Sequence, residues 1–237
     1  MTDIPELWDH QKITIEESLN MLLQGKNVLI SLPTGSGKSR IIIEILKALK
    51  DNNPNLHVLV IAPRRIQSGS VWQKEIQKWA GSIYNVTMSL DGKKEPKLRD
   101  EFWENVRTYN YVVLATPNVI EIDLNNGLID INYFDIIVLD EAHHSIKRSE
   151  DGYSLSKWYS FLKNYKNKII GATISDKVPL TLVDETSKIL NASIVTTDKA
   201  KENKIDRVII KLQNPSYSLL NELISKETGR LVAIFKQ

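Results

Sequence analysis

The chain has 237 residues, and its 31 Lys and Arg balance 29 Asp and Glu to a net charge of +2. No large basic field points to a nucleic-acid partner, although one local face could still bind it. The absence of cysteine excludes disulfides, a cysteine nucleophile and thiolate zinc sites. No stretch approaches the ~18 apolar residues of a membrane span, and the N-terminal segment has no apolar signal core. We therefore expect a soluble protein that does not bind membranes and is not secreted, located in the cytoplasm or, in a eukaryote, the nucleus.

Short runs rich in Val and Ile recur along the chain and are typical of strands buried on both faces of a parallel sheet. They cover residues 27–31, 58–62, 111–115, 136–140 and 168–172. Between the first two runs, Ile42, Leu46 and Leu49 follow helical spacing, and residues 71–79 form a second candidate helix. This alternation predicts an α/β fold with a doubly wound parallel sheet and helices on both faces. Ligands bind such sheets at the carboxyl ends of the strands.

Polar segments mark the breaks in this pattern. Residues 51–55 (DNNPN) predict a turn, and residues 91–100 (DGKKEPKLRD) predict a loop. The charged stretch 198–207 (DKAKENKIDR) is the expected linker. We therefore expect one domain over residues 1–197 and, over residues 198–237, a linker with the beginning of a second lobe.

The first chemical motif, LPTGSGKS at 32–39, lies between the first strand and the first helix. Glycines there let backbone N–H groups surround a phosphate, and the helix N-terminus favours its charge. Lys38 would reach the β- and γ-phosphates of ATP, and the Ser39 hydroxyl would ligate Mg²⁺. The general pattern has Gly where this chain has Leu32. The remaining nucleotide-contacting residues would be Pro33, Thr34, Gly35, Ser36 and Gly37.

The second motif, DEAHH, begins with Asp140 at the carboxyl end of a predicted strand. Asp140 there can hold Mg²⁺ through water, and Glu141 can activate the attacking water as a general base. The next two histidines have no Cys or third His nearby to complete a metal site. We expect His143 to form a hydrogen bond beside the nucleotide.

The order of these motifs resembles the first, RecA-like motor lobe of superfamily 2 helicases and translocases of the DEAD/H-like branch. The segment LWDHQ at 7–11 is similar to the Leu-Arg-Pro-Tyr-Gln segment of that family. The resemblance implies that Gln11 recognises adenine and that His10 takes the place of the aromatic residue that stacks on the base. Trp8 and Asp9 depart from the family pattern.

Four further segments resemble segments of the same family. APRR at 62–65 and ATP at 115–117 look like its backbone-binding motifs, which implies nucleic-acid contacts by Arg64, Arg65, Thr116 and Pro117. The segment 171–175 lies where the family couples hydrolysis to movement, which implies that role for Thr173 and Ser175. The segment 71–79 (VWQKEIQKW) is similar to restriction-enzyme-type and Swi/Snf-like DNA motors, which favours DNA over RNA.

The resemblance implies an ATP-hydrolysing lobe of a nucleic-acid-dependent helicase or translocase, with Lys38, Asp140 and Glu141 as catalytic residues. A second RecA-like lobe, from the rest of the protein or from a partner chain, would complete the site, so the lobe alone should hydrolyse ATP weakly. A nucleotide-gated nucleic-acid-binding module, an RNA helicase lobe and a small-molecule kinase are the alternatives. The module would not need Glu141, and the kinase would need an acceptor pocket and a lid.

Overall fold

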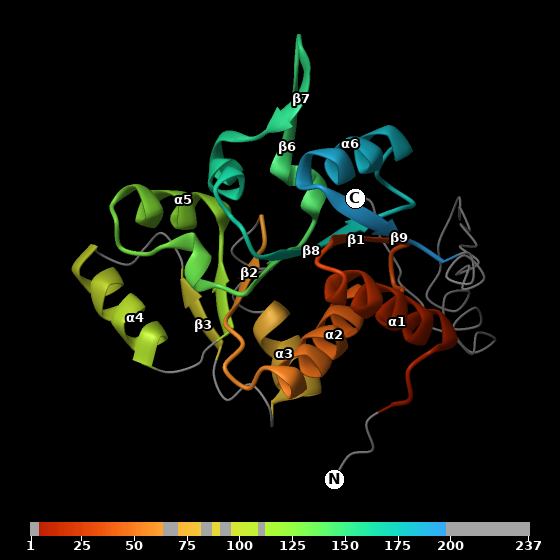
Figure 1. The fold of residues 1–237 in the computed structure, drawn as a ribbon, viewed down its shortest axis with the longest axis horizontal. Helices are drawn as coiled ribbons and strands as arrows, with labels where there is room; N and C mark the ends of the chain where they lie inside the picture. Colours follow the sequence, from red (N-terminus) through yellow and green to blue (C-terminus); the bar gives the residue numbers. More distant parts are fainter. Residues whose placement is uncertain (1–4, 64–70, 82–86, 91–95, 109–111, 198–237) are drawn as a thin grey trace, which may run out of the picture. The chain divides into compact units, whose positions relative to one another are not determined.

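A computed structural model describes residues 5–63, 71–81, 87–90, 96–108 and 112–197. Within these residues, seven strands form one sheet in the order β3-β4-β2-β5-β8-β1-β9 (Figure 1). The strands are β1 Asn27–Leu32, β2 Val58–Ile61, β3 Thr87–Leu90, β4 Val112–Ala115, β5 Ile136–Leu139, β8 Lys168–Ile174 and β9 Ala192–Val195. Every neighbouring pair in this sheet is parallel, which confirms the predicted fold class.

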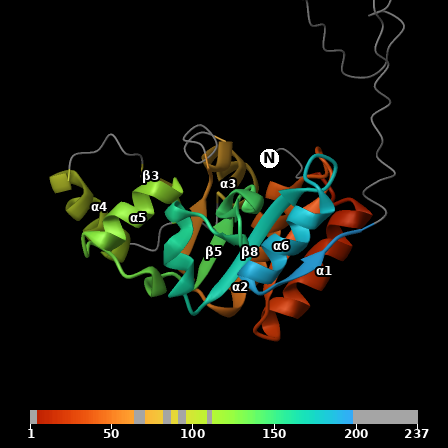
Figure 2. The same cartoon turned by 90° about the horizontal axis from the view of Figure 1, so that it is seen from above.

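Helices cover both faces of the sheet, because successive strand residues point to opposite sides. Val28 and Ile30 belong to one core, whereas Leu29 belongs to the other. The first core lies under α1, α2 and α3, and the second under α4, α5 and α6 (Figures 1 and 2). These helices are α1 Asp9–Leu23, α2 Lys38–Asn52, α3 Trp72–Ala80, α4 Pro96–Thr108, α5 Pro117–Asn125 and α6 Leu180–Leu190.

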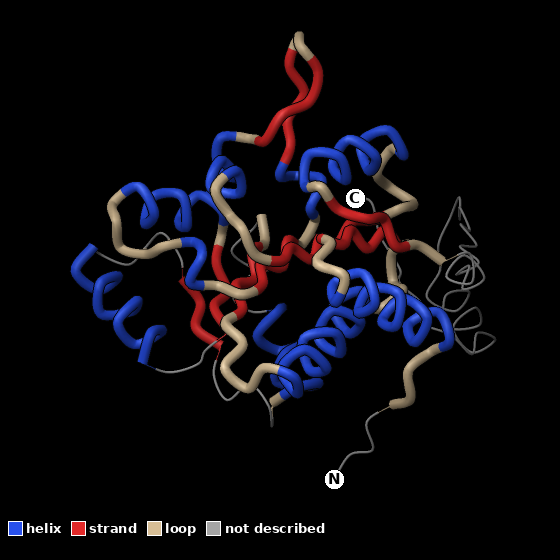
Figure 3. The backbone as a smooth tube through the Cα atoms, viewed as in Figure 1, coloured by secondary structure: helices blue, strands red, loops and turns tan. Residues whose placement is uncertain are grey.

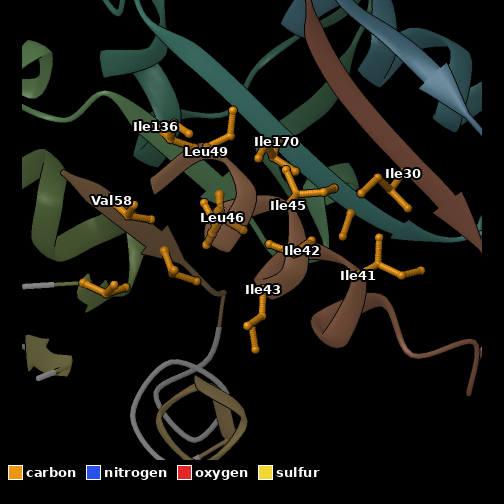
Figure 4. Close-up of a cluster of buried hydrophobic side chains, with 14 of the residues drawn as sticks. Ile30, Ile41, Ile42, Ile43, Ile45, Leu46, Leu49, Val58, Ile136 and Ile170 are labelled. Atoms are coloured by element: carbon orange, nitrogen blue, oxygen red, sulfur yellow. The ribbon is translucent and has the colours of Figure 1, made fainter. Parts of the chain in front are cut away.

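Helix α2 lies at the centre of the first core. The predicted spacing of Ile42, Leu46 and Leu49 is confirmed, and all three side chains are buried (Figure 4). Ile41 and Ile45 are also buried, so the helix is apolar around much of its circumference. Burial at this level fixes the N-terminus of α2 firmly beside the end of β1, where the phosphate-binding motif lies.

Several elements differ from the expectations. The predicted loop 91–100 is wrong in its second half, because α4 begins at Pro96, where a proline that lacks an N–H suits the first turn of a helix. Strands β3 and β9 were not expected, nor was the two-stranded hairpin of β6 Ile146–Ser149 and β7 Gly152–Leu155. This hairpin extends away from the sheet directly after the short helix η3 Ala142–Ser145 (Figure 3).

The predicted linker and second-lobe segment, residues 198–237, lie outside the described residues. The domain boundary at 197 therefore stays a prediction.

No helix in the described part of the chain is long and apolar enough to cross a membrane. The remaining short helices are η2 Ile131–Tyr133, before β5, and η4 Lys157–Lys163, before β8.

Candidate active site

The phosphate-binding motif forms the loop between β1 and α2. Gly35 and Gly37 have φ angles of 82° and 79°, in the left-handed region that glycine adopts without strain. A Cβ at Gly35 would meet open space, whereas one at Gly37 would collide with the Gln11 amide. Gly37 is therefore required by its backbone, and a side chain there would also have to displace the Gln11 amide. The resulting open loop at a helix N-terminus has the form of an anion cradle and fits a phosphate group.

Helix α1 supports this loop from below. His10 Nε2 lies 2.9 Å from the carbonyl oxygen of Ser36, and Gln11 Nε2 donates to the same oxygen at 3.1 Å. Gln11 Oε1 accepts from the backbone N–H of Trp8 at 3.1 Å, as in a capping box. The side chain of Gln11 is thus engaged at both ends.

The predicted stacking of His10 on the base stays a prediction. His10 is only 3% exposed, and its Nε2 contacts the carbonyl oxygen of Ser36 in the loop. Trp8 is 53% exposed, and its ring centroid lies 5.5 Å from that of His10. The exposed aromatic at this end of α1 is therefore Trp8, which departs from the family pattern in sequence.

Lys38 points back along the loop. Its Nζ donates to the carbonyl oxygens of Leu32 and Pro33, at 3.1 and 3.0 Å. Burial lowers the pKa of Lys38, while the negative charges of Glu141, Asp176 and Asp140 act in the opposite direction. These carboxylates lie 102 or more residues from Lys38 in the sequence. The ends of β1 and β5 lie at the same edge of the sheet, because both strands pair in parallel with β8.

Asp176 is a contact that sequence reasoning missed. Its Oδ1 accepts from the backbone N–H of Thr34 at 3.0 Å and from the Thr34 hydroxyl at 3.2 Å. No motif marks Asp176, since it follows the segment 171–175 by one position. It holds Thr34, whereas His10 and Gln11 hold Ser36 of the same loop.

Asp140 and Glu141 follow β5 at the carboxyl edge of the sheet. Asp140 Oδ2 accepts from the indole Nε1 of Trp72 at 2.9 Å. Burial raises the pKa of Asp140, and the hydrogen bond from Trp72 opposes that rise. Glu141 adopts φ 50° and ψ 51°, which is left-handed backbone at a non-glycine residue. The chain therefore turns sharply between the two carboxylates.

His143 connects this turn to β8. Its Nδ1 lies 3.0 Å from the Thr173 hydroxyl and 3.6 Å from Glu141 Oε2. Burial, with a smaller contribution from His144, lowers the pKa of His143 to about 4. His143 is thus neutral at pH 7 and acts as a hydrogen-bonding group. Ser175 lies beside the phosphate loop, because its backbone N–H donates to the carbonyl oxygen of Leu32 at 3.1 Å.

The oxygens of Ser39 and Asp140 are hard donors of the kind that Mg²⁺ prefers. Among the described residues, no group of three His, Cys, Asp or Glu side chains could enclose a metal ion. This donor set fits Mg²⁺, which usually keeps several waters and binds through one or two protein oxygens together with substrate phosphates. Sequence reasoning missed the neighbours of both donors on α3, Trp72 and Glu75, as residues of the site.

The predicted nucleic-acid contacts are only partly described. Arg64 and Arg65 lie outside the described residues. Thr116 is buried and is the N-cap residue of α5, and Pro117 is the first residue of that helix. No contact in the structure tests their predicted role, which stays a prediction.

The fold and the clustered motifs define a RecA-like P-loop lobe of the superfamily 2 type. The family described as type III restriction enzyme, res subunit, matches residues 4–176, and the chain belongs to this family. The ATP-dependent DNA helicase mph1 of Sclerotinia sclerotiorum is 29% identical over 183 residues, which cover 76% of this chain and 14% of that protein. The resemblance to superfamily 2 helicases is thereby confirmed.

Two solved structures have the same fold. The helicase domain of Pyrococcus furiosus Hef matches with a TM-score of 0.60 and 25% identity, over 80% of this chain and 37% of that one. The Sulfolobus solfataricus SWI2/SNF2 ATPase core, solved with dsDNA, matches with a TM-score of 0.56 and 19% identity, over 74% and 33%. The chain therefore spans only a fraction of the length of these relatives.

Proposed function

We propose that this chain is the ATP-binding and ATP-hydrolysing lobe of a nucleic-acid-dependent helicase or translocase, with DNA as the preferred track. One observation carries this proposal: the phosphate loop after β1 and the Asp140–Glu141 pair after β5 lie at the same carboxyl edge of the parallel sheet, on the two sides of β8. Phosphate binding, metal binding and general-base chemistry are thus available at one edge of the sheet.

Each residue has a distinct part in the proposed reaction. Lys38 would exchange its contacts with the carbonyls of Leu32 and Pro33 for stronger, charge-assisted bonds to phosphate oxygens. Ser39 and Asp140 would hold Mg²⁺, which neutralises phosphate charge when it is bound. Glu141, turned out of the regular strand, would orient and deprotonate the attacking water.

The nucleotide base would lie near the N-terminus of α1. Trp8 offers the exposed aromatic face there, and it can stack on a planar base. Gln11 would hold Ser36 in the loop and would recognise adenine after its contact with the Trp8 backbone is exchanged for the base. The likeness to mph1 and to the Hef helicase domain supports DNA as the track and a second lobe as the partner.

The proposal is tested by measuring ATP binding and hydrolysis by the chain, with and without single- and double-stranded DNA or RNA. We expect Glu141→Gln to preserve ATP affinity and to lower hydrolysis by about 10²-fold or more. Lys38→Ala should weaken ATP binding itself, because it removes a charge-assisted phosphate contact. Glu104→Gln, which changes a 77% exposed carboxylate on α4, serves as the matched control and should alter neither property.

The outcomes separate the alternatives. Stimulation by DNA supports the proposal, whereas stimulation by RNA alone favours an RNA helicase lobe. Tight ATP binding with no turnover, in the presence of either nucleic acid and of a second lobe, would favour the nucleotide-gated module. Unchanged ATP binding by Lys38→Ala would overturn the phosphate-site assignment.

A further inference from the structure

Helix α3 contacts both side chains that the proposed function assigns to Mg²⁺. Trp72, the first residue of α3, donates its indole N–H to Asp140 Oδ2 at 2.9 Å. One turn later, Glu75 Oε2 accepts a hydrogen bond from the Ser39 hydroxyl at 3.4 Å. Trp72 is only 3% exposed, so the first of these contacts is shielded from solvent. The nine-residue helix α3 thus contacts two donors that follow different strands of the sheet, Ser39 on α2 after β1 and Asp140 after β5.

The Glu75 carboxylate is itself held in place. Trp79 Nε1 donates to Glu75 Oε2 at 2.9 Å, one helical turn further along α3. The guanidinium of Arg40 lies 3.9 Å from the centre of the Trp79 ring, and Arg40 also pairs with Glu44 at 2.6 Å. Because Arg40 directly follows Ser39 in α2, these contacts tie α3 to the same turn that carries the proposed metal donor.

The two contacts have complementary chemistry. Asp140 is an acceptor, and its partner Trp72 is a donor with no acceptor capacity. The Ser39 hydroxyl donates a hydrogen bond to the Glu75 carboxylate, which directs the lone pairs of the Ser39 oxygen away from Glu75. Partners of this kind orient metal ligands in proteins, and their loss typically weakens metal affinity by 10–100-fold.

We propose that Trp72 and Glu75 are positioning residues of the magnesium site, with Trp72 orienting the Asp140 carboxylate and Glu75 orienting the Ser39 hydroxyl. This inference rests on the proposed function, since it concerns Mg²⁺ bound together with ATP. Neither residue touches the phosphates in this role. Their effect is therefore on the Mg²⁺ concentration that the site requires.

The first test is a Mg²⁺ titration of binding of a fluorescent ATP analogue to the 237-residue chain. Trp72→Phe and Glu75→Ala should each raise the half-saturating Mg²⁺ concentration by about 10–100-fold, with binding in excess EDTA unchanged. Glu75→Gln keeps an acceptor oxygen and should show a smaller rise than Glu75→Ala. Trp103→Phe removes an equivalent indole-to-aspartate bond elsewhere in the fold and should leave the midpoint unchanged.

A second measurement uses the unsubstituted sequence and so does not depend on the folding of a variant. With fluorotryptophan incorporated, the ¹⁹F resonance of Trp72 should shift when Mg²⁺ is added to the nucleotide-saturated chain, whereas that of Trp103 should not. Unchanged midpoints in both α3 variants, or a Trp72 resonance that ignores Mg²⁺, would overturn the inference.

Different results would overturn the proposed function and the positioning roles. A wild-type chain that binds no ATP analogue, with or without Mg²⁺, would overturn the proposed function and this inference with it. A wild-type chain with Mg²⁺-dependent binding, matched by all the variants, would overturn only the positioning roles of Trp72 and Glu75.

Discussion

Trp72 donates to Asp140 at 2.9 Å, and Trp103 donates to Asp123 at 3.0 Å, so the chain contains the same contact twice. Trp72 belongs to the core under α1–α3, whereas Trp103 belongs to the core under α4–α6. The partners of the two carboxylates differ. Asp123 is fully buried and also pairs with Arg99 at 2.7 Å, which brings a full positive charge into contact.

The comparison shows how one contact serves two purposes. Arg99 compensates the buried charge of Asp123, and the resulting cluster fastens α4 to α5. Asp140 forms no such ion pair within the described part of the chain, and burial raises its pKa. A metal cation that binds together with a ligand would therefore stabilise the charged carboxylate of Asp140. The carboxylate of Asp123 is already stabilised by Arg99.

The largest expected effect on the free energy of unfolding concerns the cluster of Asp123, Arg99 and Trp103. Asp123→Ala removes the carboxylate and leaves the largely buried Arg99 without its ion pair, which typically costs about 3–5 kcal/mol. Urea unfolding should show this loss in the free energy of unfolding. Nucleotide binding by the remaining folded protein should be unchanged. A loss below about 1 kcal/mol would mean that the cluster does not hold α4 and α5 together.

The next largest effect concerns the pH dependence of stability that His143, next to the acidic pair, contributes. The pKa of His143 is lowered from 6.5 to about 4, so between these pH values the folded state binds fewer protons than the unfolded state. The stability that neutral His143 contributes is complete above pH 6.5 and is lost as the pH falls toward 4.

His143→Gln should remove this part of the pH dependence, which amounts to roughly 2–3 kcal/mol. Urea unfolding of the wild type and the variant across this range measures it as the change in their stability difference. Asn167→Ala, with no titratable group added or removed, serves as the control. Parallel stability curves for the wild type and His143→Gln would show that His143 is not held neutral by burial.

The smallest expected effect on stability concerns Asp140 itself. Its raised pKa means that the charged carboxylate costs stability at neutral pH. This cost decreases as the pH falls through the raised pKa and is gone below the ordinary value of 3.8. Asp140→Asn removes the charge and keeps an acceptor for Trp72. We expect an unfolding free energy that is unchanged or higher by up to about 1 kcal/mol, together with loss of Mg²⁺-dependent nucleotide binding. A loss of stability as large as that of Asp123→Ala would show that the charge of Asp140 stabilises the fold as the charge of Asp123 does.

Sequence patterns predicted the inner part of the sheet well. Strands β1, β2, β4, β5 and β8 are continuous apolar runs because both of their faces are covered. Strands β3 and β9 were missed because they lie at the two ends of the strand order, where pairing is on one side only. Ala192–Val195 is also mostly half-buried, so its sequence lacks the continuous apolar run.

Helix α4 was missed for a different reason. The charges of residues 91–100 indicated a loop, but Phe102, Trp103 and Val106 follow with helical spacing and are all buried. Pro96, which marks the start of the helix, lies inside the stretch that was taken as polar, and the buried apolar residues begin at Phe102, just after it.

The phosphate loop and the acidic pair were predicted because their chemistry is local in sequence. The contacts of Trp72 with Asp140 and of Asp176 with Thr34 join residues 68 and 142 positions apart. Such pairings depend on how the helices and strand ends pack, and no short motif records them. The burial of His10 also follows from the way α1 passes beneath the loop.

The left-handed backbone at Glu141 sets a limit on any attempt to make this chain more stable. The other non-glycine residue with positive φ among the described residues is Asn191, which suits that conformation and ends α6. Glutamate has no such aptitude, and left-handed backbone costs it roughly 1–2 kcal/mol. A stabilising redesign guided by backbone preference would choose Gly or Asn at position 141. It would obtain a sturdier protein by discarding the carboxylate on which the proposed hydrolysis depends.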